Sequence, residues 1–208
     1  DTYDSNYRYI NFTTLAASGA TITVPVLRHL AANHAYQLTS GSRPVFRDLL
    51  GLRYSESDGV DDFMQARFTI VQPIDRISAI KQISWTNADR IFCSGSAISS
   101  TLQQAGSSPF LVLYTGTANL VMDPSPAIDT AGVLTERHSG ATSRVAFNNN
   151  AYDVADTGTL APGGITIGAR YDGASAGNFH LYQAVMRGST TEFSDAEILV
   201  AKTFCQQK

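Results

Sequence analysis

The sequence predicts an all-β protein, an antiparallel two-sheet β-sandwich of jelly-roll type that ends in one short α-helix. Three observations predict this fold. Short apolar segments of strand length recur about every ten residues from Val45 onward, turn residues separate them, and the clear helix signal lies near the end of the chain. No internal repeat is visible that would favour a propeller or a solenoid.

Composition limits the function classes. The 208 residues fit one large β domain, and charged residues make up only 16% of them. The net charge is −3 and no run of Lys or Arg occurs, so nucleic acid is not an expected partner. No apolar run approaches the roughly 20 residues that cross a bilayer, so membrane insertion is not expected either.

The chain is predicted to divide into an N-terminal segment or linker, residues 1–32, and one domain, residues 33–208. Residues 1–19 carry aromatic side chains without a clear period, and residues 20–27 form a strand that Pro25 places at a sheet edge. The strands of the domain follow in order, each bounded by turn residues. They are expected at residues 51–55, 61–71, 76–85, 88–94, 109–115, 118–122, 132–138, 142–148, 151–155, 164–170 and 178–187.

The last strand has the clearest alternation. Phe179 and Leu181 fall on one parity, and His180 and Tyr182 fall on the other. We expect this strand in a sheet interior, with His180 as a sheet residue whose polar atoms are satisfied.

A capping box then predicts the helix. In Ser194-Asp-Ala-Glu197, the serine hydroxyl can accept from the Glu197 amide while the Glu197 carboxylate accepts from the Ser194 amide. The helix is predicted from Ser194 to about Phe204. We expect it to pack Ile198, either Leu199 or Val200, and Phe204 onto the sandwich.

Several segments, in this order, resemble the concanavalin A-like (laminin-G-like) jelly-roll domains of phage and prophage structural proteins. Residues 33–37 with 42–45 resemble their "GNHA-x-Q … RP" opening, and residues 54–64 resemble "FDGVDDFL". Residues 142–150 are similar to the "SRLYVNG" hairpin, although three asparagines stand where Asn-Gly is common. The "ITIG" strand at residues 165–168 and the helix start complete the match.

The resemblance implies a host-attachment domain of a phage-like particle, a tail fibre or receptor-binding protein that binds host surface polysaccharide. Its partners would be other virion subunits and further copies of itself, with a trimer expected for a fibre tip. Its place would be the virion surface, after assembly in the bacterial cytoplasm. The alternative is a decoration or connector protein of a capsid or tail without a glycan site. A weaker alternative is a polysaccharide hydrolase or lyase.

The densest acidic group is Asp58-Gly-Val-Asp61-Asp62, with Glu56 just before it. Glycosidases of this fold place three acids at alternate strand positions, and here Val60 occupies the third position. Hard oxygen ligands on a turn suit Ca²⁺, so Asp58, Asp61 and Asp62 are a candidate metal site, although EF-hand spacing is missing. The simpler interpretation is a tight turn in which Asp61 accepts from exposed amides.

Sugar recognition calls for aromatic faces with a few polar groups, and two places could supply them. The first is the turn with Trp85, Asn87 and Asp89, although the parity of Trp85 favours a core position. The second combines an asparagine-rich turn with a glycine-rich loop, at Asn148, Asn150, Tyr152, Tyr171 and Asp172.

No catalytic arrangement is evident. The four histidines are scattered, and no Ser-His-Asp order or GxSxG elbow appears. The prediction is that the chain is not an enzyme and holds no cofactor apart from the candidate Ca²⁺. Cys93 and Cys205 form no CxxC pair; we expect two free thiols, with a disulfide as the alternative.

Overall fold

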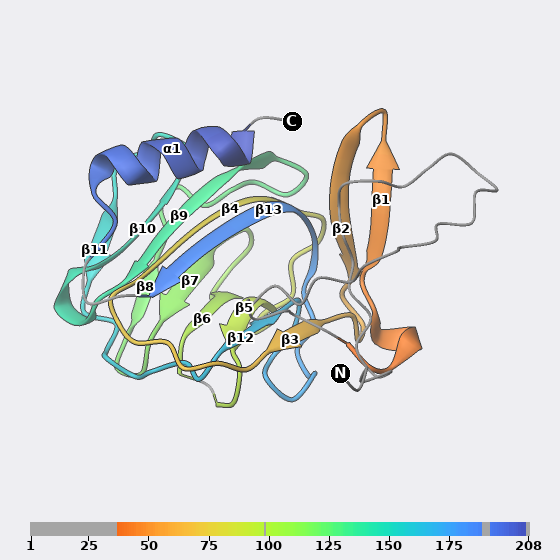
Figure 1. The fold of residues 1–208 in the computed structure, drawn as a ribbon, viewed down its shortest axis with the longest axis horizontal. Helices are drawn as coiled ribbons and strands as arrows, with labels where there is room; N and C mark the ends of the chain where they lie inside the picture. Colours follow the sequence, from red (N-terminus) through yellow and green to blue (C-terminus); the bar gives the residue numbers. More distant parts are fainter. Residues whose placement is uncertain (1–36, 98, 189–191, 207–208) are drawn as a thin grey trace, which may run out of the picture.

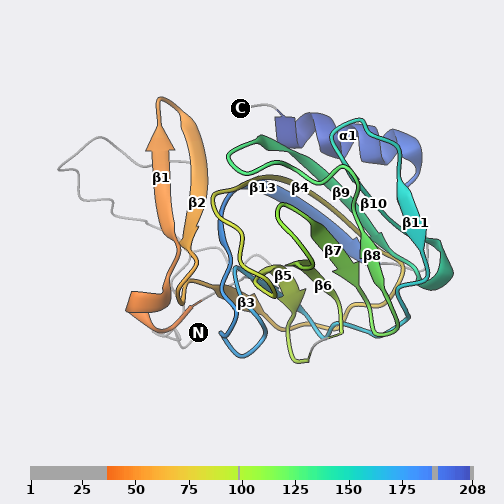
Figure 2. The ribbon, with the colours of Figure 1, turned by 180° about the vertical axis from the view of Figure 1, so that it is seen from behind.

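The computed structural model describes residues 37–97, 99–188 and 192–206. In this part of the chain, two antiparallel sheets pack face to face and one helix lies on the outer face of the larger sheet (Figure 1). The view from behind shows the smaller sheet in front of the larger one (Figure 2). The predicted sandwich with a C-terminal helix is confirmed.

The larger sheet has seven strands in the order β1-β2-β13-β4-β9-β10-β11. Their bounds are β1 Val45–Leu49, β2 Leu52–Asp58, β13 Asn178–Gly188, β4 Ile74–Gln82, β9 Ala131–His138, β10 Ser143–Phe147 and β11 Asp153–Ala155. As predicted, the last strand lies inside a sheet, because β13 pairs with both β2 and β4.

The smaller sheet has six strands in the order β3-β12-β5-β6-β7-β8. Their bounds are β3 Met64–Ala66, β12 Ile165–Ile167, β5 Arg90–Ser94, β6 Thr101–Gln104, β7 Leu111–Tyr114 and β8 Asn119–Val121. Two short 3₁₀ turns, Ser40–Ser42 and Gly140–Thr142, precede β1 and β10.

The main core lies between the sheets, where apolar side chains from both inner faces meet. It comprises Ile80, Ile91, Phe92, Leu102, Leu111, Leu113, Leu120, Met122, Leu134, Val145, Phe147 and Phe179. A second, smaller cluster lies on the outer face of the larger sheet, under the helix, and comprises Ile77, Ala79, Val133, Ala201 and Cys205. The larger sheet is therefore covered on both sides over part of its area.

Several strand boundaries differ from the prediction, and three of the differences matter for the fold. The strand expected at 61–71 is reduced to Met64–Ala66. Two observed strands, β1 and β6, were not predicted. The residues of β6, Thr101–Gln104, show no apolar alternation that would indicate a strand. The strand expected at 76–85 ends at Gln82, so Trp85 lies in the following turn, half-buried, instead of in the core.

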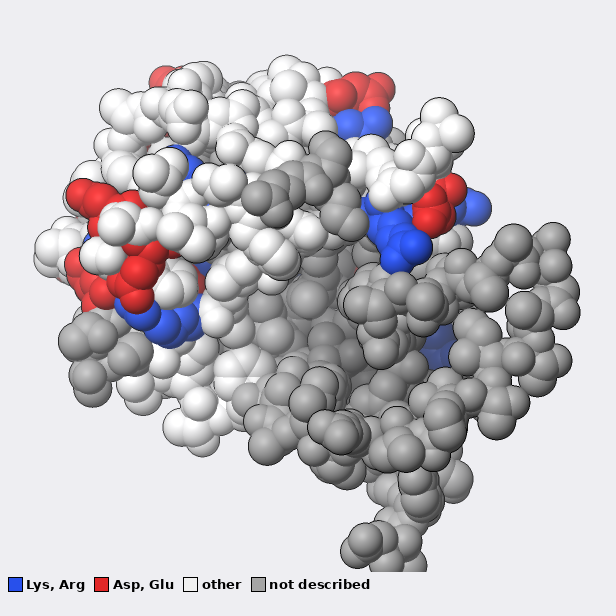
Figure 3. All heavy atoms as spheres, turned by 45° about the horizontal axis from the view of Figure 1, so that its top comes forward, with Lys and Arg blue, Asp and Glu red and all other residues white. Residues whose placement is uncertain are grey.

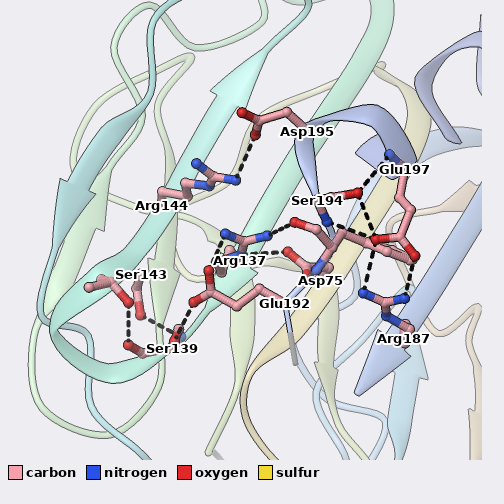
Figure 4. Close-up of polar contacts among 12 residues, drawn as sticks. Asp75, Arg137, Ser139, Ser143, Arg144, Arg187, Glu192, Ser194, Asp195 and Glu197 are labelled. Carbon is pink, nitrogen blue, oxygen red and sulfur yellow. Dashed lines mark hydrogen bonds and ion pairs between the residues drawn. The ribbon is translucent and has the colours of Figure 1, made fainter. Parts of the chain in front are cut away.

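Helix α1, Asp195–Gln206, begins as the capping box predicts. Glu197 accepts from the Ser194 amide at 2.8 Å, and the Ser194 hydroxyl accepts from the Glu197 amide at 3.3 Å. Arg187 of β13 donates to the same carboxylate at 2.8 Å (Figure 4). The carboxylate accepts from the Ser194 amide, from Arg187 and from the Ser194 hydroxyl, and these bonds to its charged form lower the pKa of Glu197 to about 2.

A buried ion pair anchors the segment before the helix (Figure 4). The Arg137 Nε donates to Asp75 at 2.7 Å, and both side chains are buried. Arg137 also donates to the Phe193 carbonyl and to Glu192, and Asp75 accepts from the Phe193 amide, each at 2.6 Å. Every charge in this group has a partner, as burial requires.

The buried face of α1 differs from the prediction. Ile198, Ala201 and Cys205 are buried, whereas Val200 is 70% and Phe204 is 48% exposed. A spacing of three and four residues puts these three on one side of a helix, and the positions in between face outward. The predicted burial was right for Ile198. It was wrong for Phe204 and for the alternative pair Leu199 and Val200, which are exposed.

Cys93 and Cys205 are both buried and free, as predicted. No helix of the described residues is both long and apolar enough to traverse a bilayer. Residues 1–36 lie outside the described part of the chain. The predicted strand at 20–27, the aromatic segment 1–19 and the boundary at residue 33 therefore stay predictions.

Candidate functional site

Three aromatic side chains meet on the outer face of the larger sheet, and we call them the aromatic cluster: Tyr54, His180 and Tyr182. The Tyr54 and His180 rings stack with centroids 4.3 Å apart and planes at 23°. The Tyr182 ring tilts against Tyr54 at 5.5 Å and meets His180 edge-on at 6.3 Å. All three are partly exposed, so a stacked ring pair and the third ring beside it reach solvent here.

Strand register explains why the cluster forms. Glu56 of β2 is opposite His180 of β13, which in turn is opposite Lys81 of β4, so these three share the outer face. A β-bulge between Leu181 and Gln183 then shifts the pairing by one residue. After the bulge, Val185 faces outward towards α1. The bulge thus separates the aromatic residues of β13 from the part of the strand where Val185 packs under α1.

Two ion pairs border the aromatic cluster. The Arg47 Nε lies 2.6 Å from Glu56, and the Lys81 ammonium lies 3.1 Å from Asp129. Burial, and then Lys81, lower the pKa of His180, so its imidazole is neutral at neutral pH. In Figure 3, charged side chains gather in separate groups, and much of the described surface between them is uncharged.

An apolar groove continues the surface towards the helix. It has a volume of about 570 Å³ and lies between β13 and α1. Its lining is Val185, Phe193, Ala196, Glu197, Val200, Ala201 and Phe204. Tyr182 packs on the same apolar cluster as Val185 and Phe193, so groove and aromatic cluster adjoin.

The predicted acidic group does come together. Carboxylate oxygens of Asp58, Asp61 and Asp62 all lie within 4.8 Å of one another. Burial raises the pKa of Asp62, and the neighbouring carboxylates add to the rise. Asp62 accepts from the Asp58 amide, whereas Asp61 accepts from the Ser42 hydroxyl, so the amide contact expected of Asp61 belongs to Asp62. The three oxygens are compatible with Ca²⁺, and this site stays a prediction.

A backbone contact links the turn of the first predicted sugar site to the loop that carries part of the second. The turn with Trp85, Asn87 and Asp89 adjoins the loop with Tyr171 and Asp172. The connection is made by Arg90, whose amide donates to the Ser175 carbonyl at 2.9 Å. Trp85 is fixed by a 3.1 Å hydrogen bond from its indole to the Phe110 carbonyl, while Asn87 is exposed.

The remaining predicted residues have separate, local contacts. Asn148 has φ +55° and accepts from the Val133 amide at 2.9 Å, so it builds a turn. Tyr152 lies under the Arg144 guanidinium at 4.3 Å and near Lys202 of α1. Asn150 is exposed after the same turn. Tyr171 contacts Arg170 instead. The contacts of the asparagine-rich turn and of the glycine-rich loop are therefore separate.

The aromatic cluster was missed because its members are distant in sequence. The parity of His180 and Tyr182 was visible, and the alternation around Tyr54 would have been the corresponding signal in β2. Nothing local in the sequence, however, states that β2 pairs with β13 more than 100 residues later. His180 was read as an ordinary sheet residue for that reason.

The structure also lines up a serine, a histidine and a glutamate between the sheets. Ser100 Oγ is 3.1 Å from His138 Nδ1, and His138 Nε2 is 3.6 Å from Glu136. Arg76 donates to Glu136 at 2.9 Å and stacks on Phe92. All of these side chains are buried, which indicates a polar layer within the core. Burial by itself would raise the pKa of Glu136. Arg76 and His138 outweigh that effect and hold this pKa below its usual value.

Comparison with known proteins supports the fold. No protein-family model and no curated sequence matches the chain. Domain 4 of AbnA, a GH43 extracellular arabinanase from Geobacillus stearothermophilus solved with arabinotriose, matches 78% of this chain. The match covers 82% of that domain, at a TM-score of 0.58 and 11% identity. This likeness shows the fold alone, a β-sandwich consistent with the predicted concanavalin A-like class.

Two further solved structures are similar at lower scores. The exoplasmic/lumenal domain of VIP36 in its Ca²⁺/Man3GlcNAc-bound form matches 79% of this chain and 90% of that one, with TM-score 0.43 and 12% identity. Trypanosoma rangeli sialidase in complex with the inhibitor DANA matches 74% of this chain at TM-score 0.45 and 8% identity. The chain spans only 27% of the sialidase.

The prediction that the chain is not an enzyme is wrong. It rested on missing catalytic motifs, yet the matching arabinanase domain shows that this fold occurs within a glycoside hydrolase. Fold and motif therefore give no ground for assigning the chain to the non-enzymes.

Proposed function

We propose that this chain is a glycan-binding domain and that the aromatic cluster is its binding surface. The observation that carries the proposal is the partly exposed group of Tyr54, His180 and Tyr182 on a rigid sheet face. The apolar face of a pyranose stacks on such rings. A sheet face orients the rings more rigidly than a loop does.

The flanking ion pairs supply the polar half of a sugar site. Glu56 can accept from ring hydroxyls and Arg47 can donate to them, and both are partly exposed. Lys81 and Asp129 offer the same chemistry on the other side. A few polar groups beside an apolar floor form the usual arrangement for small ligands. The solved complex of the arabinanase domain with arabinotriose adds support by analogy of fold.

Our fuller proposal is attachment of a phage-like particle to host surface polysaccharide. Its support is the set of sequence motifs that resemble phage and prophage jelly-roll proteins. The location would be the virion surface, and the partners would be other virion subunits. Shallow sites bind weakly, and a millimolar Kd corresponds to about 4 kcal/mol. Several copies, such as the predicted trimer, would then be needed to hold a particle.

The test is a glycan screen followed by calorimetry with the best oligosaccharide. Tyr54→Ala and Tyr182→Ala should each weaken binding by about ten-fold, equivalent to about 1.4 kcal/mol. Tyr114→Ala, a half-buried tyrosine of the smaller sheet, is the matched control. Tyr171→Ala tests the loop residues predicted from sequence. Mass analysis of the oligosaccharide after incubation reports any cleavage. Full affinity in both cluster variants would refute the proposed surface.

A second candidate function, assembly without a glycan site, is favoured by the outer face of α1. Leu199 and Val200 are 64% and 70% exposed, and Phe204 lies one turn further along. Thr203 and Gln206 are also exposed and uncharged, so the charged exposed positions of α1, Asp195 and Glu197, lie in its first turn. An uncharged helix face of this length is typical of a contact with another subunit. A chain that binds no glycan in any oligomeric form would fit this decoration or connector function instead.

A further inference from the structure

The apolar groove between β13 and α1 has the size of a small-molecule site. Its volume of about 570 Å³ lies within the roughly 300–1,000 Å³ that such sites span. Val185 and Ala201 line it and also pack in the apolar cluster under the helix. Val200 and Phe204 line it as well, although they are 70% and 48% exposed. The groove therefore presents large apolar side chains to solvent around a concave surface.

Local sequence explains why this space is not filled. Two of the helix residues that line the groove, Ala196 and Ala201, have side chains of a single methyl group. At the start of the helix Phe193 lines the groove, and the Arg187 guanidinium lies 3.8 Å from the centre of its ring. The backbone of Phe193 is anchored by the buried ion pair of Arg137. This wall of the groove is thus fixed before any ligand binds.

The chemistry of the lining suits an aliphatic chain better than a sugar ring. Among the lining residues, Glu197 alone has a polar side chain. Its two oxygens already accept from Arg187 and from the Ser194 amide, each at 2.8 Å (Figure 4). The hydroxyls of a sugar placed in the groove would therefore lose water without gaining partners, which is costly. Methylene groups lose no hydrogen bonds and gain from burial.

The groove is continuous with the aromatic cluster. The Tyr182 ring contacts Tyr54 and His180, and its side chain packs on the same apolar cluster as Val185. Tyr182 and Val185 belong to one strand, three residues apart, which is about 10 Å at the rise of a strand. One ligand can therefore place its sugar on the rings and a short chain in the groove.

We propose that the groove binds a short acyl chain carried by the saccharide, so that the ligand of this domain is an acylated glycan. The proposal rests on the proposed glycan-binding function and names the ligand class of that site. The aromatic cluster holds the sugar, and the groove buries the methylene groups of its substituent.

Chemical-shift titrations with alkyl glycosides test this site, because their chains reproduce the methylene groups of an acyl substituent. The probes are the methyl, butyl and hexyl glycosides of glucose, galactose and mannose. Affinity for at least one sugar should rise with chain length, by up to about four-fold for each methylene group that is buried. The methyl glycosides measure the sugar alone.

Substitutions on α1 locate the chain. Val200→Asp should abolish the gain from the hexyl chain and leave binding of the methyl glycoside unchanged. The matched control is Leu199→Asp, at a 64% exposed apolar residue of the same helix that does not line the groove. Phe204→Ala should reduce the gain without adding a charge, and it decides the question if Val200→Asp does not fold. An equal loss in Leu199→Asp would overturn the proposal.

Two further measurements distinguish other occupants. If 1-hexanol binds as tightly as the hexyl glycoside, the sugar contributes nothing and the proposal is overturned. If light scattering shows a dimer that Val200→Asp dissociates, the groove is filled by a second copy of the chain, which also overturns it.

This proposal and the proposed function fail in different ways. If oligosaccharides bind through Tyr54 and Tyr182 but chain length has no effect with any of the three sugars, the acyl site is refuted and glycan binding stands. If the chain-length effect depends on Val200 while Tyr54→Ala and Tyr182→Ala change nothing, the aromatic cluster is refuted as the sugar surface. Absence of binding to every hexyl glycoside refutes the acyl site, and the glycan screen decides the proposed function separately.

Discussion

At the residue scale, the interior of this sandwich contains more charge than its low overall charge content suggests. Arg76 and Glu136 form a hydrogen-bonded pair between the two sheets, and both are almost fully buried. Such a pair contributes less to stability than its geometry implies, because both ions have lost their hydration. Removing one partner should therefore destabilise the fold much more than replacing both partners with apolar side chains.

We predict that Arg76→Met lowers the free energy of unfolding by about 3–5 kcal/mol, since it leaves the Glu136 carboxylate buried without its cation. The double variant with Glu136→Leu should recover most of that loss. Urea unfolding of both single variants and the double variant measures the coupling. Additive losses would contradict this account of the pair.

A second residue-scale prediction concerns the helix cap. Ser194→Ala should cost about 1 kcal/mol and lower the Tm by about 2–4 °C. Thr203→Ala, on the exposed side of the same helix, is the control and should change stability little. Because the pKa of Glu197 is about 2 in the folded protein, its bonds to the cap persist above its usual pKa of 4.5. The stability that this pKa shift contributes should be lost as the pH falls from 4.5 towards 2.

Much of the candidate site could not be read from single residues. The sequence identified the carboxylates of residues 58–62 and the loop tyrosine Tyr171, because turn residues and acidic runs are local signals. The aromatic cluster depends instead on which strands are neighbours. Arg90 was noted only beside Trp85, since the burial of its side chain is a property of the fold.

At the element scale, helix α1 shows which part of a local pattern is informative. Its start was predicted because a capping box is written in four consecutive residues. Its buried face was not, because apolar residues at 198–201 and 204 surround the helix on nearly every side. Only the position of the sheet beneath it selects Ile198, Ala201 and Cys205 for burial.

This assignment can be tested by paired substitutions. Ile198→Ala should lower the free energy of unfolding by about 2–4 kcal/mol, because it removes a buried side chain and leaves a cavity. Phe204→Ala should cost less than about 1 kcal/mol although it deletes more atoms, since Phe204 is about half exposed. Chemical denaturation of the two variants checks the order, and a larger loss for Phe204 would contradict the observed helix orientation.

At the scale of the whole molecule, stability should depend on pH through His138. Burial lowers the pKa of this imidazole in the folded state, and the unfolded value is about 6.5. The neutral form is therefore accommodated at no penalty above pH 6.5, and the folded state loses stability as the pH falls below that value. Glu136 adds a second loss below its usual pKa of 4.5, because its folded pKa is also lowered.

Unfolding free energies measured at pH 7.5 and 5.5 should show the first loss, and His138→Phe should reduce the difference between the two values. His180→Gln is the comparison variant, since the pKa of His180 is also lowered but its side chain is partly exposed. An unchanged pH dependence in His138→Phe would place the acid sensitivity elsewhere.

The overall architecture was predictable from the sequence, whereas the strand order was not. Strand-length segments with regular turns indicate a two-sheet sandwich, because few other folds bury such segments. Which strand lies beside which is decided by packing of the complete inner faces. The six-stranded sheet, with β3 and β12 joined across 100 residues, illustrates this point.

The position of β13 also bears on how the protein is made. This strand, near the end of the chain, lies between β2 and β4, whose hydrogen-bonding edges it fills. During synthesis both edges stay open until Gly188 has left the ribosome, so the larger sheet closes only after its other strands have been made. Pairing at this sequence separation is slow, and open strand edges invite association between nascent chains. The interval before β13 emerges is thus when the nascent chain is most exposed to aggregation.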